Sequence, residues 1–489
     1  MESNKDNIPK MTDLDEILAL QADHDIFEEL KIGDIKDKIL DDVQANILKS
    51  TKHLYTLFCF FTFKPEHKKT IVNWLKHLRL TSAREQIETE QEKSETEGKS
   101  SSENMIGLYL SYQGYEFFCD PEKIKHLIRF EDEDIFAFQE GLAKRCPRAF
   151  GAGEDDYKHP SHALILIATD DARLKEVNDV RGQKESTEAQ LFQLFAEWAT
   201  PPVKDFDAFE ENYGKVFFEI GMRNPEGSDG LPREWFGFRD GISNPRFFPD
   251  RGRPNPPGFV PDEPAPLDVA LRRNRLAGNY ACGSFVVFLK LEQNDKAFKR
   301  MVKELAGKLG MEDYKGLAAA YIIGRHKDGT PLHEAFNFPT LGDRNRNLND
   351  FDYGNDQDGA VCPMHAHIRK ANPRDGQAWG RIVRRGKVYG RDNSKNKGIL
   401  FLSYQSSLLA FEDMVNRGLY GYKYKNKILG KDMLFVNKGE YQGNHRYRNA
   451  SGYPRSPYLR AEKLVEFKGG QYFFASSISF IQKSLENFI

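Results

Sequence analysis

Residues 361–390 read VCPMHAHIRKANPRDGQAWGRIVRRGKVYG. Two histidines, His365 and His367, lie close together here, and an Asn-Pro-Arg tripeptide follows at 372–374. A basic run then occupies residues 381–385. An isolated histidine is usually structural, but these two lie among cationic side chains and Gly/Pro turns, which is unusual for a core segment. The stretch therefore predicts a ligand site.

A second block upstream carries an acidic residue between glycines. It reads GFRDG over residues 237–241 and centres on Asp240. Asp-Gly is a common turn dipeptide, so the block taken alone predicts a turn as readily as a site. Glycine does allow the backbone to come close to a flat cofactor, because it has no side chain.

Together the two blocks resemble the dye-decolourising peroxidases. That family runs as a proximal His, then Arg, Asn-Pro-Arg, and a distal Arg before Tyr-Gly, with a Gly-x-x-Asp-Gly signature upstream. Weaker similarity extends from about residue 42 to the C-terminus, so it covers most of this chain. Many members have Pro before the Tyr-Gly where this chain has Val388, a difference that removes no chemical group.

The resemblance implies a peroxidase with non-covalent haem b. Such an enzyme reduces hydrogen peroxide and oxidises dyes, phenolics or other one-electron donors through a ferryl–porphyrin radical. His367 matches the iron ligand, since neutral imidazole is a usual proximal ligand. Asp240 matches the distal group that moves the peroxide proton, and Arg384 matches the cation that stabilises the separating charge.

His365 competes with His367 for the role of ligand. We favour His367, because it has the family's offset to Arg369 and Asn372. His365 stays open as a solvent-side residue or a neighbour of the ligand. The carboxylate that accepts the other N–H of a ligand histidine is assigned by spacing to Asp432, with Glu412 and Asp413 as alternatives.

Further residues are expected around the cofactor. Ile399 and Phe401 alternate on a strand and face one side, as a pocket wall or as ordinary core. The full set of expected cofactor contacts is His367, Gly241, Ile242, Ser243, Arg325, Arg369, Asn372, Arg374, Ile399, Phe401 and Asp432. The family also implies surface oxidation through aromatic radicals, for which the candidates are Trp235, Trp379, Tyr389 and Tyr404. Arg381 and Arg385 are expected to be solvated.

Composition describes a globular protein without a nucleic-acid partner. The chain has 489 residues, 39% hydrophobic and 29% charged, with a formal net charge of −2. This length fits two or three domains. No apolar run approaches the roughly 20 residues of a membrane span. The polar N-terminal residues carry no secretory signal pattern, so we expect a cytoplasmic protein.

The cysteine pattern points to reduced thiols. Five cysteines are scattered without a Cys-x-x-Cys pair, which argues against a disulfide framework or a zinc site. No Cys-x-x-Cys-His is present, so haem would be held non-covalently. Cys59 and Cys282 lie in strand-like runs and are expected in the core.

Hydrophobic periodicity predicts a repeated β-α-β-β-α-β order. The expected strands are 54–63, 106–118, 163–167 and 216–220, then 285–291, 321–323, 399–404 and 471–474. Helical faces are expected near 71–78, 191–198, 298–305 and 408–415. The fold class is α+β, with two ferredoxin-like domains whose antiparallel sheets carry helices on one face. The family resemblance implies that these domains enclose a haem.

We expect an N-terminal extension over 1–45, a first domain over 46–270 with the Asp240 motif, and a second domain over 271–489 with the haem ligand. Irregular stretches at 224–278 and 326–398 carry the two motif blocks. Residues 84–104 lack core-forming side chains and are expected to form an exposed helix extension or a disordered insertion.

Other functions remain open from sequence. One alternative is a haem-handling protein that releases iron or detoxifies porphyrin. Another is a haem sensor without turnover, and a third is a structural protein without haem. The oligomeric state, including a homo-oligomer, is not decided by the sequence.

Overall fold

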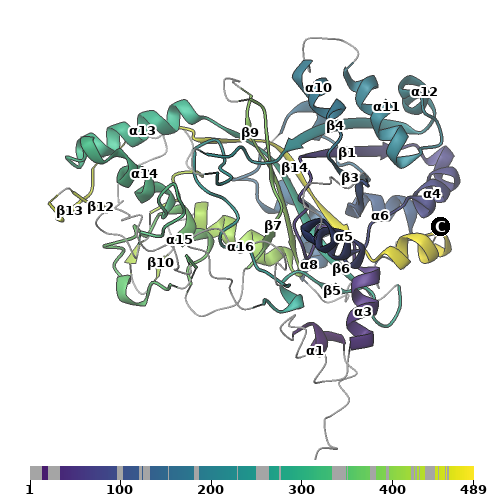
Figure 1. Ribbon diagram of the computed structural model, residues 1–489, viewed down its shortest axis with the longest axis horizontal. Helices are drawn as coiled ribbons and strands as arrows, with labels where there is room; N and C mark the ends of the chain where they lie inside the picture. Colours follow the sequence, from purple (N-terminus) through teal and green to yellow (C-terminus); the bar gives the residue numbers. More distant parts are fainter. Residues whose placement is uncertain are drawn as a thin grey trace, which may run out of the picture.

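The computed structural model of the protein is shown in Figure 1. It describes residues 14–19, 33–95, 103–120, 124, 133–151, 153–180, 187–227, 230–248, 264–274, 277–332, 348–349, 351–374, 381–391, 396–419, 423–424, 427–428, 430–435, 447–449, 451–457, 459 and 462–488.

The first half is one antiparallel sheet with helices packed on one face. Its strands are β1 (Tyr55–Phe63), β2 (Met105–Leu110), β3 (Ala163–Thr169) and β4 (Gly214–Met222), in the spatial order β2-β3-β1-β4. Helices α4 (Lys68–His77) and α11 (Thr187–Ala199) connect them. The apolar residues of α4 recur at helical spacing, so Ile71, Trp74 and Leu75 are all buried.

The second half repeats this arrangement. Strands β6 (Cys282–Gln293), β9 (Gly398–Gln405) and β14 (Val465–Ala475) lie in the order β14-β6-β9, and β9 also pairs with β7 (Val383–Arg384) and β8 (Lys387–Tyr389). Helices α13 (Asp295–Lys308) and α16 (Leu408–Leu419) complete the unit. Both halves show the strand order of a ferredoxin-like fold, so the predicted α+β class is confirmed.

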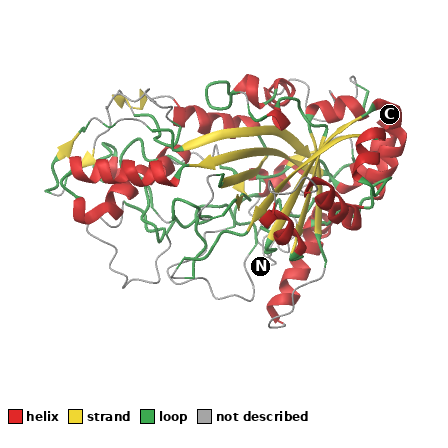
Figure 2. Cartoon of the chain, turned by 90° about the horizontal axis from the view of Figure 1, so that it is seen from above, coloured by secondary structure: helices red, strands yellow, loops and turns green. Residues whose placement is uncertain are grey.

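The strand pairings of the two halves close on themselves. Phe474 of β14 pairs with Leu110 of β2, and Met222 of β4 pairs with Val388 of β8. Because β6 and β9 are also paired, eight strands form a continuous ring. Figure 2 shows the strands crossing the middle of the molecule with helices outside them.

The two faces of the strands contribute to different cores. Alternating residues of β1 place Phe58 and Phe60 in an inner cluster with Phe288, Leu400 and others from both halves. The intervening residues pack outward against the helices. Alternation along a strand produces this division.

A third core lies beside the ring and consists mainly of helices. α13 packs against α14 (Lys315–Ile323), and α15 (His367–Ala371) packs against α14 and α16. These helices lie at the left of Figure 1, next to β7 and β9. The stretch that connects the halves adds Phe236 and Phe238 to this cluster.

The N-terminal residues take part in the fold. After α1 (Leu14–Leu18) and α3 (Gly33–Asp42), the side chain of Gln44 bonds to both backbone groups of Leu108 on β2. Arg385 donates to the carbonyls of Asn46 and Ile47. The prediction of a solvated Arg385 was therefore wrong, because its guanidinium is buried and takes up these carbonyls.

Two strand predictions were also wrong. The strand expected over 106–118 ends at Leu110, and α6 (Tyr112–Phe118) begins after Ser111, whose hydroxyl accepts the N–H of Gly114. Residues 321–323 form the last turn of α14. In the second half, the position expected for residues 321–323 is taken by β7 and β8. Their basic residues hid the apolar pattern of a strand.

Within the stretch 84–104, residues 84–95 are helical as part of α5 (Ala83–Glu95), residues 103–104 are irregular, and residues 96–102 lie outside the described residues. The remaining elements are η1 (Pro65–His67), α8 (Glu133–Glu140), α9 (Leu142–Arg145), η2 (Asp155–Tyr157), α10 (Arg173–Val180), α12 (Phe206–Asn212), η3 (Leu267–Val269), β5 (Arg272–Arg273), η4 (Glu312–Tyr314), η5 (Gly354–Asp356), β10 (Lys423–Tyr424), β11 (Lys427–Ile428), β12 (Tyr447–Arg448), β13 (Pro454–Arg455), η6 (Phe480–Ser484) and η7 (Leu485–Phe488). Among the described helices, none has the length and apolar character needed to cross a bilayer.

Candidate active site

The histidine at the start of α15 is oriented by a buried carboxylate. Nδ1 of His367 lies 2.6 Å from Oδ2 of Asp432, whose side chain is only 1% exposed. The other carboxylate oxygen of Asp432 accepts the N–H of Leu434. A carboxylate accepts at Nδ1, so Nε2 is the nitrogen left for a ligand bond.

Burial and a neighbouring carboxylate act in opposite directions on the pKa of His367. Burial lowers the pKa of His367, and the carboxylate of Asp432 more than offsets this, so the net pKa is raised. The alternatives to Asp432 are engaged elsewhere. Glu412 pairs with Arg145, and Asp413 pairs with Arg417.

His365 lies apart from this arrangement. It is 1% exposed, and its ring meets the ring of Tyr447 edge-on with centroids 4.9 Å apart. His367, by contrast, has the carboxylate of Asp432 at hydrogen-bond distance.

The second block forms a tight turn that presents Asp240. Gly237 and Gly241 have φ values of 90° and 82°, which L-residues with a side chain rarely adopt. Oδ1 of Asp240 accepts the N–H of Gly241 at 2.6 Å. A Cβ on Gly241 would meet no described atom within 4 Å, so the space beside this turn is open.

Arg384 reaches Asp240 from β7. Its Nη1 lies 3.1 Å from Oδ1 of Asp240, and both side chains are about one-third exposed, at 34% and 36%. The main chain of Arg384 is bonded to the side chain of Asn244. The structure thus brings together two residues that are 144 positions apart.

A polar cluster lies behind Ser243. Asn349 accepts from Ser243, Arg325 and Arg374 through its side-chain oxygen, and donates to the carbonyl of Ile242. Burial and the charge of Arg374 lower the pKa of Arg325 to about 10. No sequence pattern marks Asn349, because a single asparagine between unrelated loops belongs to no motif.

Arg374 is held in an unusual conformation. Its φ is 53°, and its guanidinium lies 3.8 Å from the centre of the Phe351 ring. It also donates to the carbonyls of Asn349 and Phe351. Arg374 is therefore fixed next to Arg325, and the two form a concentrated positive charge.

Arg369 has another environment. It forms a buried ion pair with Asp356 at 2.7 Å, donates to the carbonyl of Cys362, and lies over the Tyr353 ring. These contacts occupy its guanidinium and tie α15 to the preceding loop. Asn372 ends α15 through its own N–H, which donates to the carbonyl of Ile368.

Ile399 and Phe401 lie on an incompletely covered face of β9. Their neighbours Leu400 and Leu402 are fully buried in the inner core. Ile399 and Phe401 themselves are only half-buried. Arg384 pairs with Ser403 of β9 and so shares the face of Ile399 and Phe401. An apolar, partly covered strand face beside Arg384 fits a flat apolar group.

Glu234 was missed by the sequence reasoning. Its carboxylate accepts the N–H groups of Phe236 and Phe238 and the amide of Gln293. Burial raises its pKa, and the charge of Asp240 adds to this. Glu234 therefore holds the turn that leads into Asp240.

The candidate radical sites differ in position. Tyr404 is fully buried and bonds to Tyr109 and Asn46, which excludes it from the surface. Trp235 donates its indole N–H to the carbonyl of Tyr389, and the amine of Lys397 lies 4.9 Å from its ring centre. Tyr389 is buried, and Trp379 lies outside the described residues.

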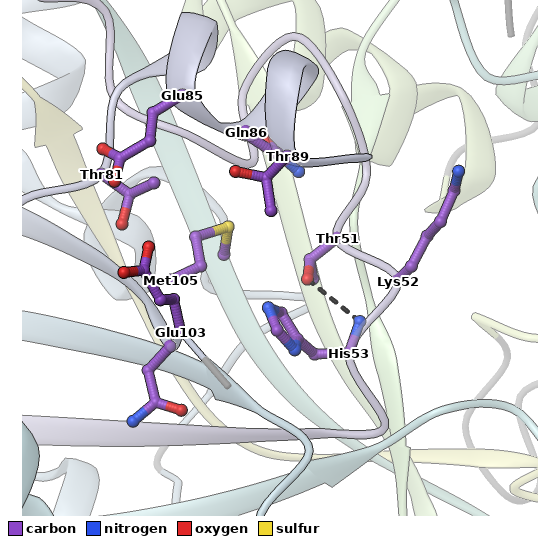
Figure 3. A pocket seen from close by; sticks show the side chains of 10 residues that line it. Thr51, Lys52, His53, Thr81, Glu85, Gln86, Thr89, Glu103 and Met105 are labelled. Atoms are coloured by element: carbon purple, nitrogen blue, oxygen red, sulfur yellow. Dashed lines mark hydrogen bonds between the residues drawn. The ribbon is translucent and has the colours of Figure 1, made fainter. Parts of the chain in front are cut away.

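A surface pocket elsewhere contains none of these residues. It is lined by residues 51–53, part of α5 and the start of β2, as Figure 3 shows. The hydroxyl of Thr51 accepts the N–H of His53 within it. The candidate site is therefore the group around His367, Asp240 and Arg384.

Known proteins share this architecture. Residues 312–434 match the family model of the C-terminal part of Dyp-type peroxidases. The multifunctional dye peroxidase DyP2 of Amycolatopsis sp. is 28% identical over 481 residues, covering 91% of this chain and 95% of the relative. A DyP-type peroxidase from Anabaena superimposes with a TM-score of 0.73 at 27% identity, covering 91% of this chain and 95% of that one.

The chain belongs to the dye-decolourising peroxidase family. A dye-decolorizing peroxidase of Exidia glandulosa is 30% identical over 361 residues, which is 66% of this chain and 65% of the relative. Deferrochelatases of Yersinia match only 100 residues, at 37% identity, or 19% of this chain. The protein is thus an oxidoreductase that acts on peroxide.

The residues of this peroxidase fit the haem of its family. His367 offers an oriented nitrogen, Ile399 and Phe401 offer an apolar wall, and Arg325 with Arg374 offers positive charge for carboxylates. The five cysteines are free and buried.

Proposed function

We propose that this peroxidase holds haem b non-covalently through His367 and reduces hydrogen peroxide with Asp240 and Arg384 as its catalytic residues. The observation that carries this is the Asp240–Arg384 contact of 3.1 Å, beside the partly covered face of β9 that holds Ile399 and Phe401. When bound, haem would supply the redox chemistry: it would accept two oxidising equivalents from peroxide and pass them on to one-electron donors.

Asp240 is suited to carry the peroxide proton. Its Oδ1 accepts from Gly241 and from Arg384, while no hydrogen bond to Oδ2 is found among the described residues. Oδ2 is therefore the oxygen that takes the proton from one peroxide oxygen and returns it to the other, which leaves as water. Positioned proton transfer of this kind contributes about 10²–10⁴-fold to a rate.

Arg384 supplies the positive charge. The main chain of Arg384 is held on β7 by Asn244, and its guanidinium is held by Asp240. The guanidinium therefore needs little reorganisation during the reaction. A fixed cation stabilises negative charge as the oxygen–oxygen bond breaks, and removing such a donor costs about 10²–10³-fold.

The haem contacts follow from the same geometry. We propose Arg325 and Arg374 as partners of the propionates, with Gly241, Ile242 and Ser243 beside the distal turn and Asn372 at the end of α15. Arg369 enters this set only indirectly, because Asp356 occupies it. Reducing substrates are dyes, phenolics or other one-electron donors, as the names of the relatives suggest.

Stopped-flow mixing with hydrogen peroxide tests these roles. Asp240→Asn and Arg384→Leu are expected to slow the first spectral change by at least about 100-fold. Asp179 and Arg391 form an exposed ion pair of the same type, with a distance of 2.9 Å. Asp179→Asn and Arg391→Leu are therefore matched controls, and equal rates in all four variants would refute the roles.

An absorption spectrum tests the ligand. Wild-type protein reconstituted with haem is expected to show a Soret band that is altered in His367→Ala. A band unchanged in that variant would move the ligand elsewhere. Analysis of products separates peroxidase turnover, which gives oxidised dye, from iron release, which gives free porphyrin.

Other features remain proposals. We take residues 46–270 and 271–489 as two domains that follow the N-terminal extension, because each contains one complete set of ferredoxin-like strands. A cytoplasmic location, the absence of a nucleic-acid partner and a homo-oligomeric state are predictions that fractionation, binding assays and light scattering would test.

A further inference from the structure

Among the described strands, the one that carries Arg384 has a neighbour on one edge only. β7 is the last strand in the sheet order, and it pairs with β9 through Val383–Tyr404 and Arg384–Ser403. The N–H of Arg385 points to β9, where it donates to the carbonyl of Leu402. Because successive residues of a strand direct their peptide groups to opposite sides, those of Arg384 face the free edge.

The side chain of Asn244 covers that edge. Its Nδ2 donates to the carbonyl of Arg384 at 3.0 Å, and its Oδ1 accepts the N–H of Arg384 at 3.0 Å. One carboxamide thus replaces the pair of hydrogen bonds that a neighbouring strand would make. Without this carboxamide, the N–H and the carbonyl of Arg384 would lose both of these hydrogen bonds.

The same asparagine belongs to the Asp240 turn. The N–H of Asn244 donates to the carbonyl of Gly241, and the N–H of Gly241 donates to Asp240. Asn244 therefore joins the main chain of the Asp240 turn to the main chain of Arg384. Asp240 and Arg384 are thus linked twice: directly through their side chains, and indirectly through Asn244 and Gly241.

We propose that Asn244 is a positioning residue that fixes the distance between Asp240 and Arg384. This inference rests on the proposed function of those two residues. Asn244 bonds to the main chain of Arg384 and to the main chain of Gly241. The side-chain contact between Asp240 and Arg384 alone would not fix either main chain. A displacement of about 1 Å in such a pair can cost about 100-fold in rate.

Asn244→Asp makes the test specific. The variant keeps the shape and the acceptor for the N–H of Arg384, but places a carboxylate oxygen against the carbonyl of Arg384. These oxygens repel each other when the new carboxyl is ionised. When it is protonated, its O–H restores the donor, so acid should restore the wild-type arrangement.

The measurement is the second-order rate of the haem-loaded enzyme with hydrogen peroxide across pH 4 to 7, expressed as a ratio to wild type. The ratio isolates the effect of the substitution, because the two proteins differ only at position 244. We expect the variant to be at least about tenfold slower at pH 7 and to approach wild type as the pH falls. Asn244→Ala should be slow at every pH.

A second readout does not depend on turnover. Fluoride affinity of the loaded protein, followed by absorption at pH 7, is expected to fall about tenfold in Asn244→Asp, because Arg384 is displaced from the anion. Asn73→Asp introduces the same charge at an exposed asparagine of α4 and is the control. If Asn244→Asp fails to fold, Asn244→Gln keeps the carboxamide but displaces it by one methylene, and slow turnover is expected with an unchanged haem spectrum.

The outcomes separate two failures. If Asp240→Asn reacts as fast as wild type, the proposed function is wrong. If Asp240→Asn is slow but the Asn244 variants match wild type, the positioning role is overturned. A ratio that stays low and constant with pH in Asn244→Asp would also overturn it, since that result indicates general damage to the turn.

Discussion

His367 donates a hydrogen bond from Nδ1 to Oδ2 of Asp432 over 2.6 Å, across 65 positions of sequence. Asp432 is itself fixed, because its N–H donates to the carbonyl of Gly418 and its Oδ1 accepts from Leu434. The carboxylate is therefore in place without any further rearrangement. Such a partner orients an imidazole ligand and increases its basicity.

Asp432→Asn is expected to weaken haem binding and raise the iron reduction potential. The amide accepts a weaker hydrogen bond than a carboxylate, so His367 donates less electron density to the metal. We expect a 10- to 100-fold loss of haem affinity, on the order seen for partners of metal ligands. Haem titration and spectroelectrochemistry measure both, with Asp179→Asn as a surface control. Unchanged values in Asp432→Asn would contradict the assignment.

Arg369→Met is expected to destabilise the protein by about 3–5 kcal/mol, because it leaves the buried carboxylate of Asp356 without its partner. Urea unfolding of the haem-free protein measures the free energy. Arg300 forms an exposed pair with Glu462, so Arg300→Met is the control and should cost less than about 1 kcal/mol. Equal losses in the two variants would show that Arg369 is not structural.

His162 predicts a loss of stability in acid. Its Nδ1 accepts the N–H of Phe63 at 3.0 Å, and its ring stacks on Phe117. Burial lowers the pKa of His162 to about 4, below the value of about 6.5 in the unfolded chain. The unfolded state therefore binds the proton first, and stability falls as the pH drops from 6.5 to 4.

Comparison with His162→Asn checks this prediction, since an amide oxygen accepts without titrating. The free energy of unfolding of the wild type should fall more steeply between pH 6.5 and 4 than that of the variant. Parallel curves would assign the acid sensitivity to other groups.

Lys370 predicts the opposite dependence. Its amine is buried, has no hydrogen-bond partner among the described residues, and has its pKa lowered by burial to about 8. Below pH 8 the buried charged amine lowers the free energy of unfolding. This penalty disappears as the pH rises from 8 to about 10.4, the pKa of a lysine in the unfolded chain. Lys370→Met should therefore stabilise the protein at pH 7, by on the order of 3 kcal/mol.

The gain from Lys370→Met should shrink between pH 8 and 10.4, because the wild type loses its buried charge there. Thermal unfolding at pH 7 and pH 10 measures the difference. A variant that is less stable than wild type at pH 7 would show that the amine has a favourable partner.

The sequence predicted the fold where one local pattern controls the structure. Apolar runs such as β1 and β6 are buried on both faces, and the helical face of α4 repeats at a clear period. The pattern failed at β7 and β8, where Arg384 and Lys387 are charged. These strands exist because β9 supplies their hydrogen bonds, which is information from elsewhere in the chain.

The candidate site divides in the same way. Motif residues such as Asp240 and His367 could be named because neighbours in sequence mark them. Asn349 and Glu234 could not, since each acts through loops that only the fold brings together. Arg385 was expected in solvent because it is charged, but it instead donates to buried carbonyls. Arg369 also donates to a buried carbonyl, and its place among the cofactor contacts stays a prediction.

The closed ring of strands has a consequence for dissecting the protein. Separating the halves at the connecting stretch would uncover the free edges of β2 and β4 on one piece and of β14 and β8 on the other. Unprotected strand edges recruit other chains. Each fragment would therefore tend to aggregate rather than fold as a smaller working unit. In the intact chain, each half covers the strand edges of the other and so protects it from aggregation.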